Sequence, residues 1–396
     1  MPLKNKEIKV LFVSRWYPNR IDAMEGLFVR KHALAVSLYN EVQVLFVKED
    51  MAVTHREVVT AEVDNIKETI VYYPFSKIRA LRAIRYFTAL FYGYRQVLSQ
   101  GFSPQILHVN VLTRVGFFAY LLKLFTHKPY LVSEHWSRYL PHGYYATTTA
   151  LHKWLTRLVV KNAAYFIPVS NVLKSALDSF CLKNPNCRIV HNTIEDFFFE
   201  HSTREICNVK RLLHISCFDE KAKNVKGIIR AFGNLYQKRQ DVELVIVGTG
   251  QDFNSIKLFV EEEYDKIPIA LVGEQTPDEV AAWLHSSDVF VLFSNYETSG
   301  VVLMESLASG TPVISTPCGI APEIITKDNG VIVPFADEQA LTEKMEWMIN
   351  HQLNFDKDKI SRSAEQFRFR SVGEQLSDIY TTIIEGRNKG TSVAAV

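Results

Sequence analysis

The sequence predicts an α/β protein built from two doubly wound, Rossmann-like domains that face each other across a cleft. Three observations lead to this fold class. First, 396 residues exceed what one ordinary hydrophobic core accommodates. Second, strand-like runs alternate with runs of helical apolar period, which is the pattern of parallel sheets covered by helices. Third, the alternation pauses in a Phe-rich joint and a polar stretch at residues 195–208 and then restarts.

In the first half, seven runs rich in β-branched and aromatic residues have the length of strands. They are Ile8–Val13, Val42–Val47, Thr69–Tyr73, Ile106–Asn110, Tyr130–Ser133, Tyr165–Val169 and Arg188–His191. Five runs between them carry apolar residues mostly at helical spacing. They are Glu25–Tyr39, Ile78–Ser99, Thr113–Phe125, Ala150–Asn162 and Asn171–Phe180. We therefore expect residues 1–192 to form the first domain around a doubly wound parallel sheet.

In the second half, six strand-like runs again alternate with helical ones. They are Leu212–Ser216, Val242–Val247, Ile269–Val272, Val289–Phe293, Pro312–Thr316 and Val331–Val333. Residues 193–370 are therefore expected to form the second Rossmann-like domain. A helical run at Ile360–Ile384 breaks near Phe369, and we expect residues 387–396 to be a disordered tail.

The composition favours a soluble, cytoplasmic protein. Apolar residues make up 47% and charged residues 22% of the chain, as in ordinary globular domains. The longest apolar run, Val115–Phe125, is interrupted by Lys123 and is too short to cross a bilayer. The first residues lead directly into a strand-like run without a small-residue cleavage site, so we do not expect a signal peptide. The five cysteines lack paired metal-binding spacing, which suits a reducing compartment.

The net charge of +2 conceals an uneven distribution. Residues 1–190 contain 25 Lys and Arg against 12 Asp and Glu, whereas residues 191–396 contain 20 against 31. A basic half and an acidic half can simply complement each other. They can also mark the half that meets an anionic surface or acceptor.

The stretch 288–325 has the pattern strand, loop, helix, strand. β-branched and aromatic residues run to Phe293, and apolar residues recur with helical spacing over the next segment. Gly300 stands where the helix begins, so the first backbone N–H groups and the helix dipole form a site for phosphate oxygens. Glu297 before the turn and Glu305 two turns on can both face that helix end. Taken alone, the two glutamates are equally consistent with surface carboxylates stabilised by the helix dipole.

Together with its neighbours, this glutamate pair resembles the donor-sugar signature of the retaining glycosyltransferases of family 4, two-domain GT-B enzymes of the glycosyl transferases group 1. The residues that carry the resemblance are Glu297, Gly300, Glu305, Ala308, Gly310, Thr311, Pro312, Val313, Ile314, Gly319 and Glu323. The resemblance implies transfer of a sugar from a nucleotide diphosphate sugar to an acceptor hydroxyl with retention of configuration. It assigns Glu297 to the sugar hydroxyls and the reacting centre, and Glu305 to the nucleotide ribose. It also implies that residues 371–386 pack back on the first domain.

Backbone N–H groups and one lysine are the partners that the resemblance implies for the donor diphosphate. The N–H groups are those of Ser299, Gly300, Val301 and Val302. Lys223 stands where the family has a lysine for the same diphosphate. The arginine that accompanies this lysine in the family is Cys217 here, so Lys226 or Arg211 would have to supply a second charge. The alternative for Lys223 is a solvated lysine in a charged loop.

Five further residues are weaker candidates. Gly248 follows a strand and opens a Gly-x-Gly turn, and Gly273 ends the next strand, where the family holds the nucleotide base, although each also suits a plain turn. Gly26 resembles the family's glycine-rich loop on the acceptor side, or marks an ordinary helix start. His135 ends a strand, as does the family histidine that contacts the donor sugar. Asn192 resembles the asparagine of the joint between the domains, where it would shape a turn.

The sequence predicts no cofactor. The turn after the first strand, Ser14–Pro18, lacks the Gly-x-Gly-x-x-Gly pattern, which argues against a nicotinamide dehydrogenase. No Asp-x-Asp motif stands at a strand end to hold a divalent ion, so we expect no metal site and a metal-independent reaction. The expected partners are the nucleotide-sugar donor and a saccharide or lipid-linked acceptor, with no nucleic acid.

A basic helix gives the one indication about the acceptor. Arg79, Arg82 and Arg85 lie three apart beside an apolar strip. Such a helix can lie on an anionic membrane surface, which would make the protein peripheral at the inner face of the membrane during surface polysaccharide or glycolipid synthesis. It can equally pack on the sheet with its arginines in water.

Two other classes of function fit the same residues. One is a non-catalytic member of the fold that binds a nucleotide or a saccharide, which Cys217 makes plausible. The other is a different enzyme on this fold, such as a nucleotide-sugar epimerase or a phosphorylase.

Overall fold

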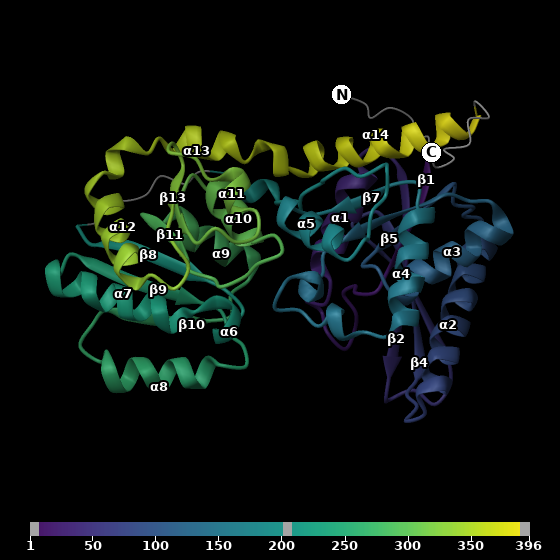
Figure 1. The fold of residues 1–396 in the computed structure, drawn as a ribbon, viewed down its shortest axis with the longest axis horizontal. Coiled ribbons are helices and arrows are strands. Elements are labelled where there is room, and N and C mark those ends of the chain that lie inside the picture. The colour runs from purple at the N-terminus through teal and green to yellow at the C-terminus, as the bar shows by residue number, and fades with distance from the viewer. Residues whose placement is uncertain (1–7, 201–207, 389–396) are drawn as a thin grey trace. The chain divides into compact units, whose positions relative to one another are not determined.

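The computed structural model of the protein describes residues 8–200 and 208–388 (Figure 1). The chain divides into two compact units. The first unit contains the chain up to Thr193 and returns from Phe369 onward, and the second unit is Ile194–Arg368. The boundaries expected from the sequence lie at residues 192/193 and 370/371.

The described part of the first unit is built on a sheet of seven strands in the order β3-β4-β2-β1-β5-β6-β7. The strands are β1 Lys9–Ser14, β2 Glu41–Asp50, β3 Glu57–Val63, β4 Ile66–Pro74, β5 Ile106–Asn110, β6 Tyr130–Glu134 and β7 Phe166–Pro168. The helices are α1 Leu27–Ser37, α2 Arg79–Ser99, α3 Arg114–Thr126, α4 Ala150–Asn162, α5 Asn171–Ser179 and α14 Phe369–Asn388. The chain moves outward from β1 to one edge and then from β5 to the other, so the topological switch point lies between β1 and β5.

Two predictions about this sheet are wrong. The sheet is not wholly parallel, because β3 pairs antiparallel with β4 at one edge. The predicted strand Arg188–His191 does not form. Two backbone N–H groups of that segment donate to carbonyls of β7 at 3.2 and 3.3 Å. Within the described residues, however, regular pairing is limited to an isolated bridge between Phe166 and Cys187.

Apolar clusters cover both faces of the first sheet. One cluster packs beneath α2, α3, α4 and α5, and the other packs beneath α1 and α14. The second cluster takes Val372, Leu376 and Tyr380 from α14. Gly373 allows α14 to approach α1 closely, because a Cβ atom at this position would lie 2.1 Å from the carbonyl oxygen of Ala35. Helix α14 is therefore part of the first unit's core.

The second unit has a parallel sheet in the order β10-β9-β8-β11-β12-β13 across its described residues. The strands are β8 Lys210–Ile215, β9 Val242–Val247, β10 Ile269–Gly273, β11 Val289–Leu292, β12 Val313–Ser315 and β13 Gly330–Ile332. The helices are α6 Glu220–Lys223, α7 Val225–Lys238, α8 Phe253–Glu263, α9 Pro277–His285, α10 Val301–Ala308, α11 Ala321–Ile324, α12 Glu338–Asn350 and α13 Lys357–Ser363. The switch point lies between β8 and β11. Two doubly wound α/β units confirm the predicted fold class.

The C-terminal region departs from the expectation in detail. The predicted break near Phe369 is confirmed: α13 ends at Ser363, a short 3-10 turn follows, and α14 begins at Phe369. Residues 387 and 388 belong to α14 rather than to a tail, and residues 389–396 lie outside the described residues. Within the described chain, no helix combines the length and apolar character that a membrane crossing requires.

Candidate active site

Lys223 and Glu297 meet at the switch point of the second unit. Lys223 ends α6, which follows β8, and Glu297 lies in the loop that follows β11. The Lys223 ammonium forms an ion pair with Oε1 of Glu297, and the Ser294 hydroxyl donates to the same oxygen at 3.1 Å. The lysine side chain is 20% exposed and the glutamate side chain 12% exposed. The structure thus joins two predicted site residues that are 74 positions apart in the sequence.

The electrostatics of this pair favour the charged lysine. Burial lowers the pKa of Lys223, but the charge of Glu297 and the hydrogen bond to it outweigh that effect, so the pKa is raised overall. Burial, followed by the charge of Glu297, raises the pKa of the nearby Cys318 thiol to about 12. Cys318 is therefore a neutral neighbour of the ion pair at ordinary pH.

Hydrogen bonds on both sides hold the loop that carries Glu297. The backbone N–H of Asn295 donates to the Ala222 carbonyl at 2.7 Å, and its side-chain amide donates to the Lys221 carbonyl at 2.9 Å. The hydroxyl of Thr316, after β12, donates to the Ser294 carbonyl at 2.5 Å. The loop after β11 is consequently tied both to α6 and to the end of the neighbouring strand.

The start of α10 lies directly beyond this loop. Gly300 caps the helix with a left-handed backbone (φ +81°), which glycine adopts without steric cost. Ser299 is buried, its hydroxyl has no hydrogen-bond partner within the described residues, and its carbonyl accepts from Ile320 N–H at 2.8 Å. The first N–H groups of α10, which include those of Val301 and Val302, have no acceptor inside the helix. They provide donors for an anion, and the helix dipole adds to the attraction.

Gly319 keeps the two parts of the site close together. Its backbone is also left-handed (φ +54°). A Cβ atom there would lie 2.6 Å from the Ser299 carbonyl oxygen and 2.8 Å from the Cβ atom of Glu297. Glu305, one of the two glutamates of the motif, lies further along α10 and is 9% exposed. A larger residue at position 319 would displace the loop that positions Glu297.

Gly248 and Gly273 bring neighbouring strand ends together. The N–H of Gly248 donates to the Gly273 carbonyl at 2.7 Å, and a Cβ atom on Gly248 would lie 1.9 Å from the carbonyl oxygen of Ser216. Space around Gly273 is open, since a Cβ atom there would meet no heavy atom within 4 Å. These two glycines therefore shape the backbone beside the switch point.

Neither residue that the sequence offered as a replacement for the missing arginine is placed to do so. Arg211 lies near the amino end of β8, where its guanidinium donates to Glu243 at 2.7 Å and to the Ser286 hydroxyl at 3.0 Å. The ammonium of Lys226 donates to the Ser255 hydroxyl at 2.9 Å. The expectation that Arg211 supplies the second charge is wrong, because Arg211 belongs to the opposite end of the strand. Lys223 is the matched cation at the site.

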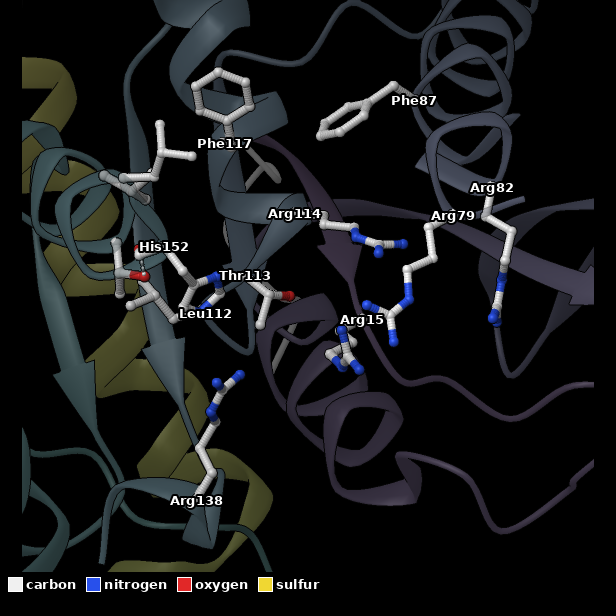
Figure 2. A pocket seen from close by; sticks show the side chains of 13 residues that line it. Arg15, Arg79, Arg82, Phe87, Leu112, Thr113, Arg114, Phe117, Arg138 and His152 are labelled. Atoms are coloured by element: carbon white, nitrogen blue, oxygen red, sulfur yellow. Dashed lines mark hydrogen bonds between the residues drawn. The ribbon is translucent and has the colours of Figure 1, made fainter. Parts of the chain in front are cut away.

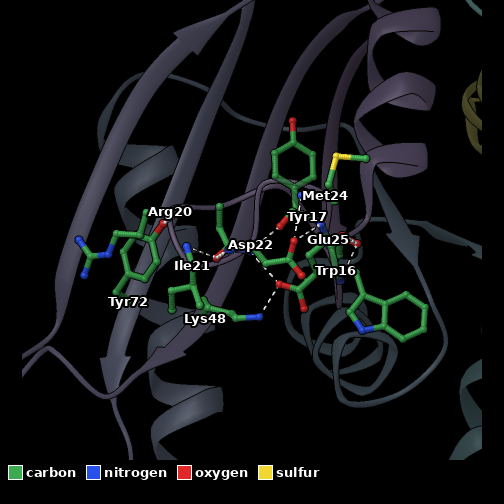
Figure 3. Close-up of polar contacts among 11 residues, drawn as sticks. Trp16, Tyr17, Arg20, Ile21, Asp22, Met24, Glu25, Lys48 and Tyr72 are labelled. Carbon is green, nitrogen blue, oxygen red and sulfur yellow. Dashed lines mark hydrogen bonds and ion pairs between the residues drawn. The ribbon is translucent and has the colours of Figure 1, made fainter. Parts of the chain in front are cut away.

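In the first unit, Gly26 begins α1 with a left-handed backbone (φ +67°). A Cβ atom at Gly26 would lie 2.4 Å from the carbonyl carbon of Trp16, so the glycine lets the loop fold against the helix start. Figure 3 shows the polar contacts that fix this loop. Glu25 forms an ion pair with Lys48 and accepts from the Asn19 amide at 2.7 Å. Glu25 is thus held within the loop.

His135 follows β6 and is buried, and neither ring nitrogen has a partner in hydrogen-bond geometry within the described residues. Its ring centroid lies 4.5 Å from that of Phe28 and 5.4 Å from that of His32. Burial holds the pKa of His135 well below its usual value, and His32 and His108 lower it further. Asn192 is also buried. His135 is therefore a neutral imidazole that can donate or accept one hydrogen bond.

Sequence reasoning identified Glu297 and Lys223 but missed the groups around them. Ser294, Thr316 and Cys318 gave no signal in the sequence. Thr316 and Cys318 follow β12 and reach the site only when β11 and β12 pair, whereas Ser294 contacts Glu297 within the loop after β11. Across residues 8–200 and 208–388, no group of three or more His, Cys, Asp or Glu side chains is arranged to hold a metal ion.

Comparison with known proteins identifies relatives of the second unit. The model of the family described as glycosyl transferases group 1 matches residues 200–367. N-acetyl-alpha-D-glucosaminyl L-malate synthase of Bacillus anthracis is 27% identical over 248 residues, which cover 60% of this chain and 64% of that protein. A capsular polysaccharide biosynthesis glycosyltransferase of Staphylococcus aureus is 26% identical over 172 residues, 42% of this chain and 44% of the other. The chain thus spans less than two thirds of the length of these curated relatives.

Solved structures match almost the whole fold at low sequence identity. Sucrose-phosphate synthase of Thermosynechococcus elongatus has a TM-score of 0.75 and 16% identity, covering 96% of this chain and all of the other. The Anabaena protein HepE, in a complex with UDP and glucose, has a TM-score of 0.70 and 15% identity, covering 95% of this chain and all of the other. The architecture of the two units is that of the GT-B fold.

Proposed function

Because residues 200–367 match the model of the family described as glycosyl transferases group 1, we propose that the chain transfers a sugar from a nucleotide diphosphate sugar to an acceptor hydroxyl with retention of configuration. One observation carries this proposal. The ion pair of Lys223 and Glu297 lies at the switch point of the second unit, beside the open N-terminus of α10. In doubly wound sheets, ligands bind outside the carboxyl ends of the strands at this point.

The donor diphosphate would be held by the N–H groups at the start of α10 and by Lys223. With the donor bound in this way, these N–H groups and Lys223 would face the negative charge that develops on the leaving diphosphate, so they would stabilise the transition state more than the ground state. A phosphate oxygen would compete with Glu297 for the lysine ammonium. Glu297 could then accept hydrogen bonds from the sugar hydroxyls, which is the role that the family resemblance gives it.

The remaining site residues would position the rest of the donor. Glu305 would accept from the nucleotide ribose, and Gly248 and Gly273 would let the backbone approach the nucleotide. His135, a neutral imidazole on the first unit, would contact the donor sugar, and Gly26 would lie on the acceptor side. We propose that the reaction needs neither a metal ion nor another cofactor, since helix N–H groups and Lys223 provide the charge compensation.

The names of the relatives support a role in surface polysaccharide or glycolipid synthesis. Besides the capsular glycosyltransferase, an alpha-monoglucosyldiacylglycerol synthase of Streptococcus pneumoniae is 33% identical over 106 residues, which cover 27% of this chain and 24% of that protein. A cytoplasmic enzyme at the inner face of the membrane fits that role. Of the predicted cationic strip, Arg82 pairs with Glu49 at 2.7 Å and Arg85 donates to two backbone carbonyls. Arg79 is the member of the strip left for an anionic surface.

The test is a screen of nucleotide sugars by thermal shift, followed by measurement of nucleotide release with and without saccharide or lipid-linked acceptors. The proposal predicts that one donor stabilises the protein and that nucleotide release rises with acceptor and yields a glycosylated product. Lys223→Met serves as the site variant. Donor binding without any transferred sugar would favour the non-catalytic alternative, and an isomerised or phosphorylated sugar would favour an epimerase or a phosphorylase.

A further inference from the structure

The first unit contains a pocket of about 600 Å³ at the carboxyl edge of its sheet. The loops after β1, β5 and β6 and the helices α2 and α4 contribute its walls. The pocket includes the switch point between β1 and β5, where ligands bind in doubly wound sheets. Its size suits a small-molecule ligand. Every residue that lines it belongs to the first unit, so the pocket does not depend on how the two units are placed.

Five arginines line this pocket, and none of its lining residues is acidic. They are Arg15, Arg79, Arg82, Arg114 and Arg138. Arg82 forms an ion pair with Glu49. The other four form no ion pair with any residue in the described chain. In Figure 2 the side chains of Arg15, Arg79 and Arg114 converge on the same space, and Arg138 points into it near His152.

Aromatic rings lie close to the guanidinium groups of Arg15 and Arg138. Arg138 is 6% exposed, and its guanidinium lies 4.4 Å from the ring centroid of Trp136 and 4.8 Å from that of Tyr144. The Arg15 guanidinium lies 4.7 Å from the ring centroid of Trp136. Contact with a ring leaves the N–H groups of a guanidinium available to oxygen acceptors. The rings therefore contact these two arginines without satisfying their hydrogen bonds.

Several buried polar atoms around the pocket lack partners. These atoms are Nε of Arg15, Oγ1 of Thr113, Nε of Arg138 and Nε2 of His152, each without a hydrogen bond to the described residues. Leaving a buried donor unsatisfied costs about 1 to 3 kcal/mol, so such atoms are commonly the ones that a ligand satisfies. Burial lowers the pKa of His152, and the charges of Arg138, Arg15 and Arg114 lower it further.

The carboxylate of Glu134 is engaged by backbone groups. The charge of Arg138 acts on Glu134, but the Glu134 oxygens accept hydrogen bonds from the backbone N–H groups of Leu112, His135 and Trp136 at 2.7 to 2.9 Å. Burial raises the pKa of Glu134 to about 7, which weakens its compensation near neutral pH. The positive charge of the pocket therefore remains available to a ligand.

We infer that this pocket binds a phosphate or diphosphate group of the acceptor, an inference that rests on the proposed transferase function. Arginine N–H edges match phosphate oxygens in a bidentate geometry, and several converging arginines suit a group with two or more negative charges. The pocket also has apolar lining residues, which are Phe87, Leu112, Phe117, Leu155 and Val159. These side chains would contact the organic part of the same molecule. The pocket shares no residue with the donor site of the second unit. A phosphorylated ligand would match the excess of basic residues in the first half of the chain.

The test titrates inorganic pyrophosphate into the full-length protein by calorimetry. All proteins carry Lys223→Met, which removes the cation of the donor site. We compare this background with one that adds Arg79→Gln and Arg114→Gln. Both arginines are exposed, so their replacement leaves Arg15 and Arg138 beside their aromatic rings. Arg95→Gln is the matched control, because Arg95 is an exposed arginine of α2 that does not line the pocket. We expect the double replacement to weaken pyrophosphate binding at least tenfold and the control to change it less than twofold.

Thermal unfolding separates ligand binding from a structural role. If the arginines serve as ligand donors, their replacement relieves like-charge repulsion and leaves the melting temperature unchanged or raised. Pyrophosphate binding that the double replacement does not weaken, or the absence of saturable binding, would overturn the inference. Nucleotide binding and sugar transfer are measured in parallel on the protein that keeps Lys223. Absence of both there, with saturable pyrophosphate binding retained, would count against the proposed function and not against the arginine pocket.

A competition experiment identifies the source of the phosphate. Vesicles that contain phosphatidylglycerol are added to the pyrophosphate complex, with phosphatidylcholine vesicles as the control. Displacement of pyrophosphate by the anionic vesicles alone supports a lipid headgroup as the source. Retention of pyrophosphate in both samples supports a soluble phosphorylated acceptor, with the same chemistry at the arginines.

Discussion

Replacement of Lys223 by Met should destabilise the second unit, and a further change at Glu297 should reverse most of that loss. Removal of one partner from a fully buried ion pair costs about 3 to 5 kcal/mol, because the other charge stays buried without compensation. The two side chains here are 20% and 12% exposed, so solvent screens part of the charge. We therefore expect Lys223→Met to cost about 2 to 3 kcal/mol. For a unit of this size, that lowers the melting temperature by roughly 4 to 12 °C.

The double variant Lys223→Met with Glu297→Gln removes both charges and should recover most of the loss. Scanning calorimetry at pH 7 measures the transition of the second unit in the wild type, both single variants and the double variant. Since the pKa of Lys223 is raised in the folded state, its stabilisation is complete below the unfolded value of 10.5 and disappears as the pH rises through the folded pKa. A change below about 0.5 kcal/mol in Lys223→Met, or additive losses in the double variant, would refute the coupling.

Four further predictions concern the second unit. Glu305→Ala should weaken nucleotide affinity by about 1 to 3 kcal/mol, whereas Glu297→Gln should mainly reduce turnover; equal losses of affinity by calorimetry would contradict this division. Activity should survive EDTA, and a loss that Mg²⁺ or Mn²⁺ restores would show a metal requirement. Gly319→Ala should slow transfer at least tenfold, because its Cβ atom collides with the Glu297 loop; Gly101→Ala, equally left-handed but with open space around the added atom, is its control for backbone strain in activity assays. Burial lowers the pKa of His214 to about 4. The free energy of unfolding should therefore fall by about 1.4 kcal/mol per pH unit as the pH drops from 6.5 to 4, because only the unfolded chain takes up the proton in this range. Melting of the wild type and of His214→Gln is compared across this pH range, and identical slopes in the two proteins would contradict the prediction.

Hydrophobic periodicity predicted most strands and helices because most elements bury one face or are wholly buried. The missed strand β3 has no buried face: its residues are exposed or partly exposed, so no alternation marks it. The segment Arg188–His191 shows the opposite error. Its β-branched residues suit a strand, but the chain runs beside β7 without a continuous ladder before it leaves the first unit. Local patterns report which residues can pair and not whether a partner strand is present.

The same distinction applies to the two candidate sites. The pattern of strand, loop and helix was enough to predict the start of α10, because phosphate-binding helix ends have a local signature. Glu297 was assigned through the resemblance of the whole motif to the family. The arginine pocket has no such signature, since its residues come from separate segments that only the sheet brings together. Helical spacing did single out Arg79, Arg82 and Arg85, yet the fold gives them different partners. Arg79 lines the pocket, Arg82 lines it while paired with Glu49, and Arg85 donates to backbone carbonyls.

The anomeric configuration of the product tests the central claim most directly. The donor found in the nucleotide-sugar screen is incubated with the protein and an acceptor, and the one-bond and vicinal couplings of the new linkage are measured by NMR. We predict that the linkage has the same configuration as the sugar in the donor, and that Glu297→Gln forms it far more slowly. A product with the opposite configuration, or transfer unaffected by Glu297→Gln, would contradict the assignment of a retaining reaction to this site.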